Sequence, residues 1–220
     1  ISKPAIVRFL ADDSETVLNG IVTLPQDYEK GKKYPLLVYG YGMPGTQIVW
    51  NRWQAGFQQF LAKEGYIVFS MDSRGMSGRG RDFKNLSYGD MANYLAKDQA
   101  TGVRWLIDKG YVDKDKIGAW GWSGGGYFTC LMLTKNADLF SVGVAVAPVT
   151  DFRLYDTAYT ERYLGLPQDN QSGYDSTSTI TYVDRLRGKL MLMHGTHYDN
   201  VHAQNTTKFV EACIRADKPK

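Results

Sequence analysis

The residues best suited to chemistry in this sequence are a serine among glycines, three histidines and a late carboxylate. Ser123 lies in GWSGG (121–125), which fits the G-x-S-x-G pattern of a nucleophilic serine on a sharp strand-to-helix turn. A strand-like IGAW precedes it and an amphipathic YFTCLMLTK follows. We therefore predict acyl transfer through Ser123, with the N–H of Gly124 at the helix N-terminus as an oxyanion donor. The alternative is a glycine-rich structural turn.

A serine nucleophile needs a base, and the chain offers three histidines. His194 closes an apolar run, which favours a buried, hydrogen-bonded imidazole. His202, in NVHAQN, lies at the start of a helical pattern and favours a surface or capping role. His197 is the least implausible substitute base, but none of the three is well placed.

Five short apolar runs predict the strands that position these residues, over 32–42, 65–72, 116–123, 140–148 and 188–195. Runs that are apolar on both faces are typical of buried parallel strands, and helical spacing lies between them. The first 25 residues predict a hairpin at the sheet edge, and 203–214 predicts a last helix. The fold class is therefore α/β, with a mostly parallel sheet and helices on both faces. Residues 150–184 break the rhythm and predict an excursion that builds a pocket.

Composition and charge set the broad class. A length of 220 residues with 43% hydrophobic residues predicts one domain over 1–220. The net charge of +3 comes without basic runs and gives no sign of a nucleic-acid partner. No apolar stretch is long enough for a transmembrane segment, so we expect a soluble chain. The two cysteines follow no metal-type spacing, and we predict no metal and no cofactor. The compartment stays open between periplasmic or secreted and cytoplasmic, and a homo-oligomer is compatible with the sequence.

Several segments, in order along the chain, resemble the prolyl oligopeptidase (S9) serine peptidases, and within them the dipeptidyl peptidase IV-like branch. They are YGYGMPGTQ, SMDSRGMSGRG, GYVDKDKIGAWGWSGGGY, VGVAVAPVTDFRLYDTAYTERYLGLP and LMHGTHYDNVH. The resemblance implies an α/β-hydrolase domain, normally carried behind a β-propeller, that cleaves peptides after proline or another small residue. It matches Ser123 to the nucleophile and Tyr41 to a tyrosine whose hydroxyl completes the oxyanion hole.

The resemblance also implies substrate-binding residues. Tyr155, Tyr159 and Tyr163 match positions near the pocket for the residue before the cut bond, and their spacing of four places them along one helical face. Asn200 matches an asparagine that binds a substrate carbonyl. Val149 and Val201 match pocket-wall positions. Without the resemblance, the three tyrosines would be interpreted as a packed aromatic stripe.

The sequence departs from the family pattern at positions that bear on activity. Where the family has the aspartate that orients the catalytic histidine, this chain has Tyr198, and Asp199 replaces that acid only if the loop shifts by one residue. Gly124 and Met43 stand where the branch usually has tyrosine and glycine. In this fold the histidine follows one further strand, so we expect the C-terminal strand and helix of the sheet to lie beyond Lys220.

Three interpretations of the function follow. The first is part of a longer S9-like peptidase whose histidine lies after Lys220, and it is the one we favour. The second is a fragment with weak esterase-like activity on peptide or ester substrates. The third, of a different class, is a catalytically impaired pseudo-hydrolase or interaction module, for which Tyr198 is the best argument.

Overall fold

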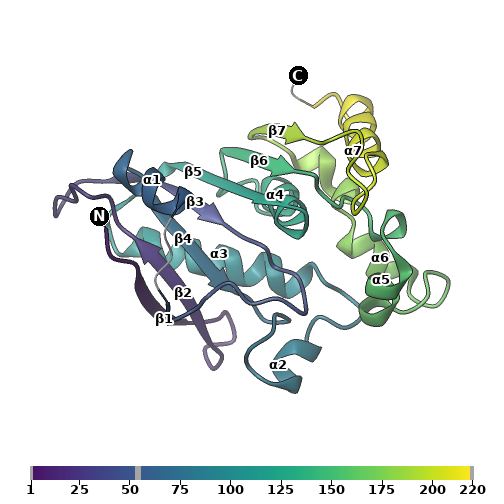
Figure 1. Cartoon of the computed structure of the whole chain (residues 1–220), viewed down its shortest axis with the longest axis horizontal. Coiled ribbons are helices and arrows are strands. Elements are labelled where there is room, and N and C mark those ends of the chain that lie inside the picture. Colours follow the sequence, from purple (N-terminus) through teal and green to yellow (C-terminus); the bar gives the residue numbers. More distant parts are fainter. Residues whose placement is uncertain (1, 53–55, 219–220) are drawn as a thin grey trace.

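A seven-stranded sheet forms the centre of the protein (Figure 1). The computed structural model describes residues 2–52 and 56–218, and the other positions of the predicted 1–220 domain lie outside the described residues. The strand order is β1-β2-β4-β3-β5-β6-β7. The strands are β1 (Ala5–Leu10), β2 (Val17–Thr23), β3 (Tyr34–Tyr39), β4 (Ile67–Asp72), β5 (Val112–Trp122), β6 (Val142–Val146) and β7 (Lys189–Met193).

The five predicted apolar runs are confirmed as β3 to β7, and these strands pair in parallel. β4 shows why the runs are continuous, because every one of its residues is buried. The predicted edge hairpin is also confirmed, since β1 pairs antiparallel with β2 and β2 pairs antiparallel with β4. Asp13 closes the hairpin turn by accepting the backbone N–H groups of Glu15 (2.9 Å) and Thr16 (2.8 Å).

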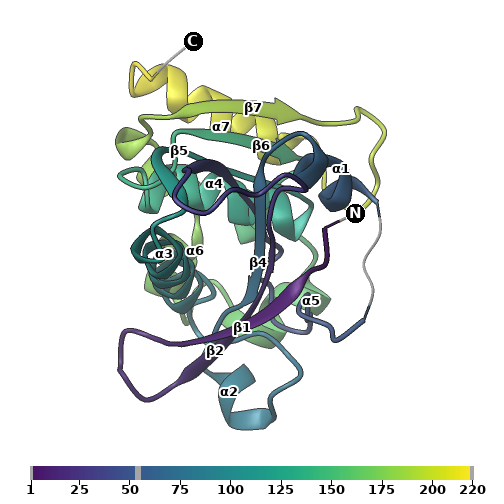
Figure 2. The ribbon, with the colours of Figure 1, turned by 90° about the vertical axis from the view of Figure 1, so that its left-hand side faces the viewer.

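Helices cover both faces of the sheet, as predicted. They are α1 (Phe57–Lys63), α2 (Arg81–Asn85), α3 (Asn93–Asp108), α4 (Gly124–Lys135), α5 (Thr157–Leu164), α6 (Gln171–Thr177) and α7 (Gln204–Arg215), with 3-10 helices η1 (Phe152–Leu154) and η2 (Thr179–Arg185). Figure 2 shows α1 and α3 on opposite sides of β4. Phe209 of α7 packs with Cys130 of α4 and Ala145 of β6, so α7 and α4 cover the same face of the sheet. No helix in the described part of the chain is both long and apolar enough to cross a membrane.

Parallel pairing places the carboxyl ends of β3, β5, β6 and β7 at one edge of the sheet, and the loops that carry the candidate residues leave from there. Residues 150–184 contain η1, α5, α6 and η2. This segment is attached to α7 by Asn205, which is fully buried. The Asn205 Oδ1 accepts the N–H of Thr150 at 2.9 Å, and the Asn205 carbonyl accepts the Thr150 hydroxyl at 2.7 Å.

One part of the sheet is exposed. Along β7, exposed residues alternate with half-buried ones, and Met191 and Met193 are 57% and 46% exposed. Trp122 at the end of β5 is 57% exposed. The other side of β7 is covered, because Leu190 and Leu192 pack into the cluster around Phe209.

Candidate active site

Ser123 occupies a strained turn between β5 and α4. Its backbone has φ 58° and ψ −115°, in a region that favours glycine. The turn is held from both sides, because the Ser123 N–H donates to the Val146 carbonyl (2.8 Å) and the Ser123 carbonyl accepts the Tyr127 N–H (3.0 Å). The strand–turn–helix context predicted from the glycine–serine pattern is therefore confirmed.

The glycines around Ser123 are required by close backbone packing. A Cβ on Gly121 would lie 2.6 Å from the Gly125 Cα, and a Cβ on Gly125 would lie 2.5 Å from the Gly40 carbonyl oxygen. Helix α4 therefore begins in direct contact with the end of β5 and with the loop after β3. Any larger residue at these two positions would push the nucleophile turn away from the sheet edge.

A small cavity adjoins Ser123, with a volume of about 70 Å³. Its lining combines aromatic and aliphatic side chains with two hydroxyl groups from serine and threonine. The lining residues are Tyr41, Met43, Thr46, Ser123, Gly124, Val149, Phe152, Tyr155 and Tyr159. Sequence reasoning missed Thr46 and Phe152 as lining residues. Met43 was noted as a departure from the family pattern, and the structure places it in the cavity wall, but no spacing rule marks the contact of this loop residue with a distant helix.

Tyr41 and Gly124 both lie beside the nucleophile. Tyr41 follows β3 and is half-buried, and its ring passes so close to Gly124 that a Cβ there would be 2.8 Å from the Tyr41 Cε1. Gly124 is the first residue of α4, so its N–H belongs to the free donors at the start of a twelve-residue helix. An oxyanion formed on a substrate bound at Ser123 would meet the positive end of that helix.

The three tyrosines of the excursion contact one another, but they do not share one helix. Tyr155 precedes α5, so the prediction that all three lie along one helical face is wrong. The physical cause is a cap: the Asp156 carboxylate accepts the Tyr159 N–H at 2.8 Å and starts a new helix after Tyr155. The rings still pack in series, with centroids 5.9 Å apart for Tyr155–Tyr159 and 5.0 Å for Tyr159–Tyr163.

These tyrosines differ in environment. Tyr159 lines the cavity, and its hydroxyl donates a hydrogen bond to the Pro44 carbonyl at 2.8 Å. Burial is the main cause that raises the pKa of Tyr159 above its ordinary value. Burial likewise raises the pKa of Tyr155. Tyr163 is only 5% exposed and packs behind Tyr159 in the core. It supports the cavity wall from behind.

Two further candidates come from the loop after β7. Asn200 is exposed, and its Oδ1 accepts the Tyr155 hydroxyl at 3.0 Å, so the structure brings these two predicted residues together. Val201 is fully buried in the main core and is absent from the cavity lining, whereas Val149 is part of it.

In the same loop after β7, the residue at the family's aspartate position, Tyr198, differs in environment from its neighbour Asp199. Tyr198 is half-buried, with its ring 6.3 Å from Trp122 and 6.2 Å from His194 by centroids. Asp199 is exposed. The ring of Tyr198 therefore occupies the packed position of the loop, and the carboxylate of Asp199 lies on its solvent side.

The histidines have structural partners. His194 is half-buried and hydrogen-bonded through both ring nitrogens, to the Thr206 hydroxyl (2.7 Å) and to the Val201 carbonyl (2.8 Å). His202 is exposed, as expected of a surface residue, and its Nδ1 accepts the Gln204 N–H at 3.2 Å just before α7, whose N-cap is Ala203. His197 is exposed and contacts Thr196. All three lie within the described residues, and none is hydrogen-bonded to Ser123.

A mostly parallel sheet with a serine on a strained strand-to-helix turn at its carboxyl edge defines the α/β-hydrolase fold. Comparisons with known proteins agree. Residues 53–220 match the model of the family described as "Prolyl oligopeptidase family". The chain belongs to the prolyl oligopeptidase family.

Individual relatives give the same result. A protein named "Probable dipeptidyl-aminopeptidase B" from Aspergillus terreus is 42% identical over 191 residues, which is 85% of this chain and 21% of the relative. Its namesake from Pyrenophora tritici-repentis is 42% identical over 198 residues, 88% of this chain and 22% of the relative. The crystal structure of Porphyromonas gingivalis dipeptidyl peptidase 4 superimposes with a TM-score of 0.95 at 35% identity, covering 99% of this chain and 31% of that one. The chain thus spans about a fifth of the length of the curated relatives it matches.

Proposed function

We propose that this chain provides the nucleophile and oxyanion donors of a serine peptidase that works by acyl transfer. The observation that carries the proposal is the position of Ser123, on a strained turn that opens onto a cavity also lined by Tyr41 and Gly124. Strain of this kind, of about 1–3 kcal/mol, persists where the surrounding structure imposes it, and it occurs most often at active sites.

The proposed reaction follows from this geometry. The Ser123 Oγ attacks the substrate carbonyl, its proton passes to a base, and the Gly124 N–H with the Tyr41 hydroxyl stabilises the oxyanion. The base then protonates the leaving amine, and water releases the acyl group from Ser123. We propose that the base is a histidine supplied by polypeptide outside these 220 residues, because the three histidines present have other partners. Asp199 is the proposed acid that orients it.

The substrate that we propose is a peptide with proline or another small residue before the cut bond. Support comes from the relatives, whose names describe dipeptidyl aminopeptidases, and from the cavity of about 70 Å³, which suits a small apolar side chain. In this proposal, residues 150–184 of a 1–220 catalytic domain supply Phe152, Tyr155 and Tyr159 to the cavity. Asn200 then binds a substrate carbonyl, and a β-propeller elsewhere in the same polypeptide screens substrates.

The experiment uses the natural polypeptide that carries these residues. A fluorophosphonate probe is expected to label the unsubstituted protein at Ser123, and Ser123→Ala is expected to abolish both labelling and cleavage of a Gly-Pro anilide. Equal labelling of Ser123→Ala would disprove the nucleophile assignment. Labelling with cleavage of esters only would favour the esterase interpretation, and no labelling would favour the pseudo-hydrolase.

A matched pair of variants tests the acid. Asp199→Asn is expected to lower kcat sharply, because the neutral amide cannot stabilise an imidazolium. Tyr198→Phe keeps the ring packing against Trp122 and removes only the hydroxyl. We expect it to leave kcat within about threefold, since the Tyr198 hydroxyl has no part in the proposed orientation of the histidine by a carboxylate. The reverse result would assign the role to Tyr198.

A further inference from the structure

Met43 is an adjustable side chain on a fixed loop beside Ser123. It is 4% exposed and lines the same cavity as the nucleophile. Its backbone is held, because its carbonyl accepts the N–H of Thr46 (3.2 Å) and the Thr46 hydroxyl (2.5 Å). The Pro44 carbonyl accepts the Tyr159 hydroxyl at 2.8 Å. Methionine has three rotatable side-chain bonds, so the side chain is the part of this wall that can adapt.

The space around Gly124 leaves no room for a side chain at this position. It is the first residue of α4, and it is not among the glycines with positive φ, so its backbone alone does not require glycine. A Cβ on Gly124 would lie 2.5 Å from the Met43 Cγ and 2.8 Å from the Tyr41 Cε1. The Met43 side chain thus fills the volume that a side chain at position 124 would need, directly after the nucleophile.

We propose that Met43 sets the depth of the cavity and so selects the size of the substrate side chain next to the reactive carbonyl. In this arrangement Met43 and position 124 share one volume, which either of them can fill. The cavity of about 70 Å³ is several times the roughly 10–15 Å³ that is needed to hold one water molecule, so it admits a few heavy atoms. The inference rests on the proposed peptidase function, and it commits to an apolar substrate side chain of proline or alanine size.

Truncation of Met43 tests the size selection. In the natural polypeptide, kcat/KM is measured for dipeptidyl anilides with proline, alanine or leucine before the cut bond. Because Met43→Ala removes three heavy atoms from the wall, it is expected to raise the leucine-to-proline ratio about tenfold, the scale of one or two methylenes in an apolar pocket. A ratio that stays within about threefold of the unsubstituted protein overturns the proposal, and a larger rise supports it.

Met71→Ala is the matched control for that experiment. Met71 is a fully buried methionine of β4 that is absent from the cavity lining. Its truncation is expected to lower the unfolding temperature, as any loss of a buried methionine does, and to leave the leucine-to-proline ratio unchanged. A ratio that rises equally in Met71→Ala would mean that general loosening relaxes selectivity, which also overturns the role of Met43.

A double-mutant cycle tests the shared volume without needing turnover. Gly124→Ala is expected to lower the unfolding temperature when Met43 is intact, and to lower it much less in the Met43→Ala background. Part of the loss remains because the Tyr41 ring also lies close. Equal losses in both backgrounds overturn the coupling, since residues that do not interact have additive effects. If the unsubstituted protein cleaves none of the three anilides, the proposed function fails and size selection fails with it, while the unfolding data still decide whether the volume is shared.

Discussion

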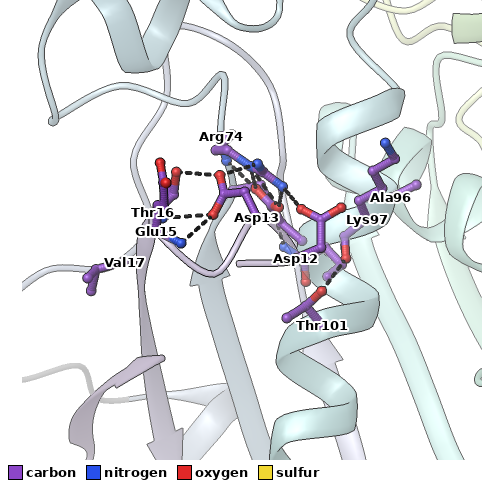
Figure 3. A network of polar contacts seen from close by, with 12 residues as sticks. Asp12, Asp13, Glu15, Thr16, Val17, Arg74, Ala96, Lys97 and Thr101 are labelled. Atoms are coloured by element: carbon purple, nitrogen blue, oxygen red, sulfur yellow. Dashed lines mark hydrogen bonds and ion pairs between the residues drawn. The ribbon is translucent and has the colours of Figure 1, made fainter. Parts of the chain in front are cut away.

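The buried ion pair between Arg74 and Asp98 gives the sharpest prediction about stability. Asp98 is fully buried on α3, and it accepts the Arg74 N–H (2.7 Å), Nε (3.0 Å) and Nη2 (2.6 Å). The guanidinium also contacts two carboxylates of the hairpin turn, Asp12 through Nη2 and Asp13 through Nη1, as Figure 3 shows. Its carbon lies 4.4 Å from the centroid of the Tyr94 ring. One arginine thus connects β1–β2, the loop after β4 and α3.

The change to make is Arg74→Met, which keeps an unbranched side chain and removes the charge. The two side-chain bonds to Asp98 and the bond to Asp13 are each worth about 1.5–3 kcal/mol with a charged partner, a gross loss of roughly 4.5–9 kcal/mol. Protonation of Asp98 relieves part of this loss. We therefore expect the free energy of unfolding to fall by about 3–5 kcal/mol at pH 7.5, as when one partner of a buried pair is removed.

The pH dependence is the specific signature of this explanation. Burial raises the pKa of Asp98 above its ordinary value of 3.8, and Arg74 opposes that rise. Without Arg74 the pKa of Asp98 rises further. A carboxyl whose pKa is raised by folding adds stability below its unfolded pKa, and that stability is lost as the pH rises through the folded value. The deficit of Arg74→Met must therefore be smaller at pH 5 than at pH 7.5.

Urea titrations followed by tryptophan fluorescence at the two pH values measure this deficit. Arg104→Met is the matched control, because its partner Asp138 is a surface residue and both side chains are more than half exposed, at 57% and 62%. It should change the free energy of unfolding by less than about 1 kcal/mol. The reasoning is refuted if Arg74→Met behaves like Arg104→Met, or if its deficit is the same at both pH values.

Two further predictions concern other buried polar groups. Burial raises the pKa of Asp72 to about 6 although its carboxylate accepts the N–H groups of Ile48 (2.8 Å) and Val49 (3.3 Å). Stability from this group is therefore fully present below its unfolded pKa and is lost as the pH rises through about 6, by about 3 kcal/mol in all at 1.36 kcal/mol per pKa unit. About 2 kcal/mol of this loss falls between pH 4 and 6, and Asp72→Asn should remove that slope in urea titrations. Asn205→Ala leaves the buried Thr150 N–H without its acceptor, and it should lower the free energy of unfolding by about 1–3 kcal/mol. The control is Thr207→Ala on the exposed side of α7, which should change the free energy of unfolding by less than about 0.5 kcal/mol.

The parallel strands could be predicted from the sequence because each one contains a continuous apolar run. In β4 every residue is buried, whereas β7 keeps an apolar run although Met191 and Met193 are exposed. Strand limits were harder to predict where polar residues lie inside a strand. β5 begins at Val112, before the predicted start at 116, and its first residues include exposed Lys114 and Asp115. The pairing shifts register between Tyr34 and Leu36 opposite this polar stretch, an irregularity that apolar periodicity does not reveal. The short helix α2 was not predicted, since it buries no residue.

At the site, the sequence located the serine turn well, because its strand and helix are adjacent in the chain. It placed Tyr155 wrongly in a helix, because the spacing of four suggested one continuous face. The cap at Asp156 overrode that spacing, and an aspartate before TAYTERYL was the signal that could have revealed it. Contacts between distant segments, such as Met43 with Gly124, depend on how β3 and β5 are aligned, and no local pattern encodes them.

The strain at Ser123 also decides how the nucleophile variants can be interpreted. The positive φ of Ser123 is imposed by its surroundings: its N–H is fixed to Val146, its carbonyl to Tyr127, and the backbone of Gly125 is packed against Gly40. None of these interactions uses the hydroxyl. Ser123→Ala should therefore keep the same turn and a free energy of unfolding within about 1 kcal/mol of the unsubstituted protein, since alanine and serine meet similar steric limits at positive φ. Loss of labelling in that variant then reports chemistry, because the cavity and the turn that frames it do not depend on the oxygen atom.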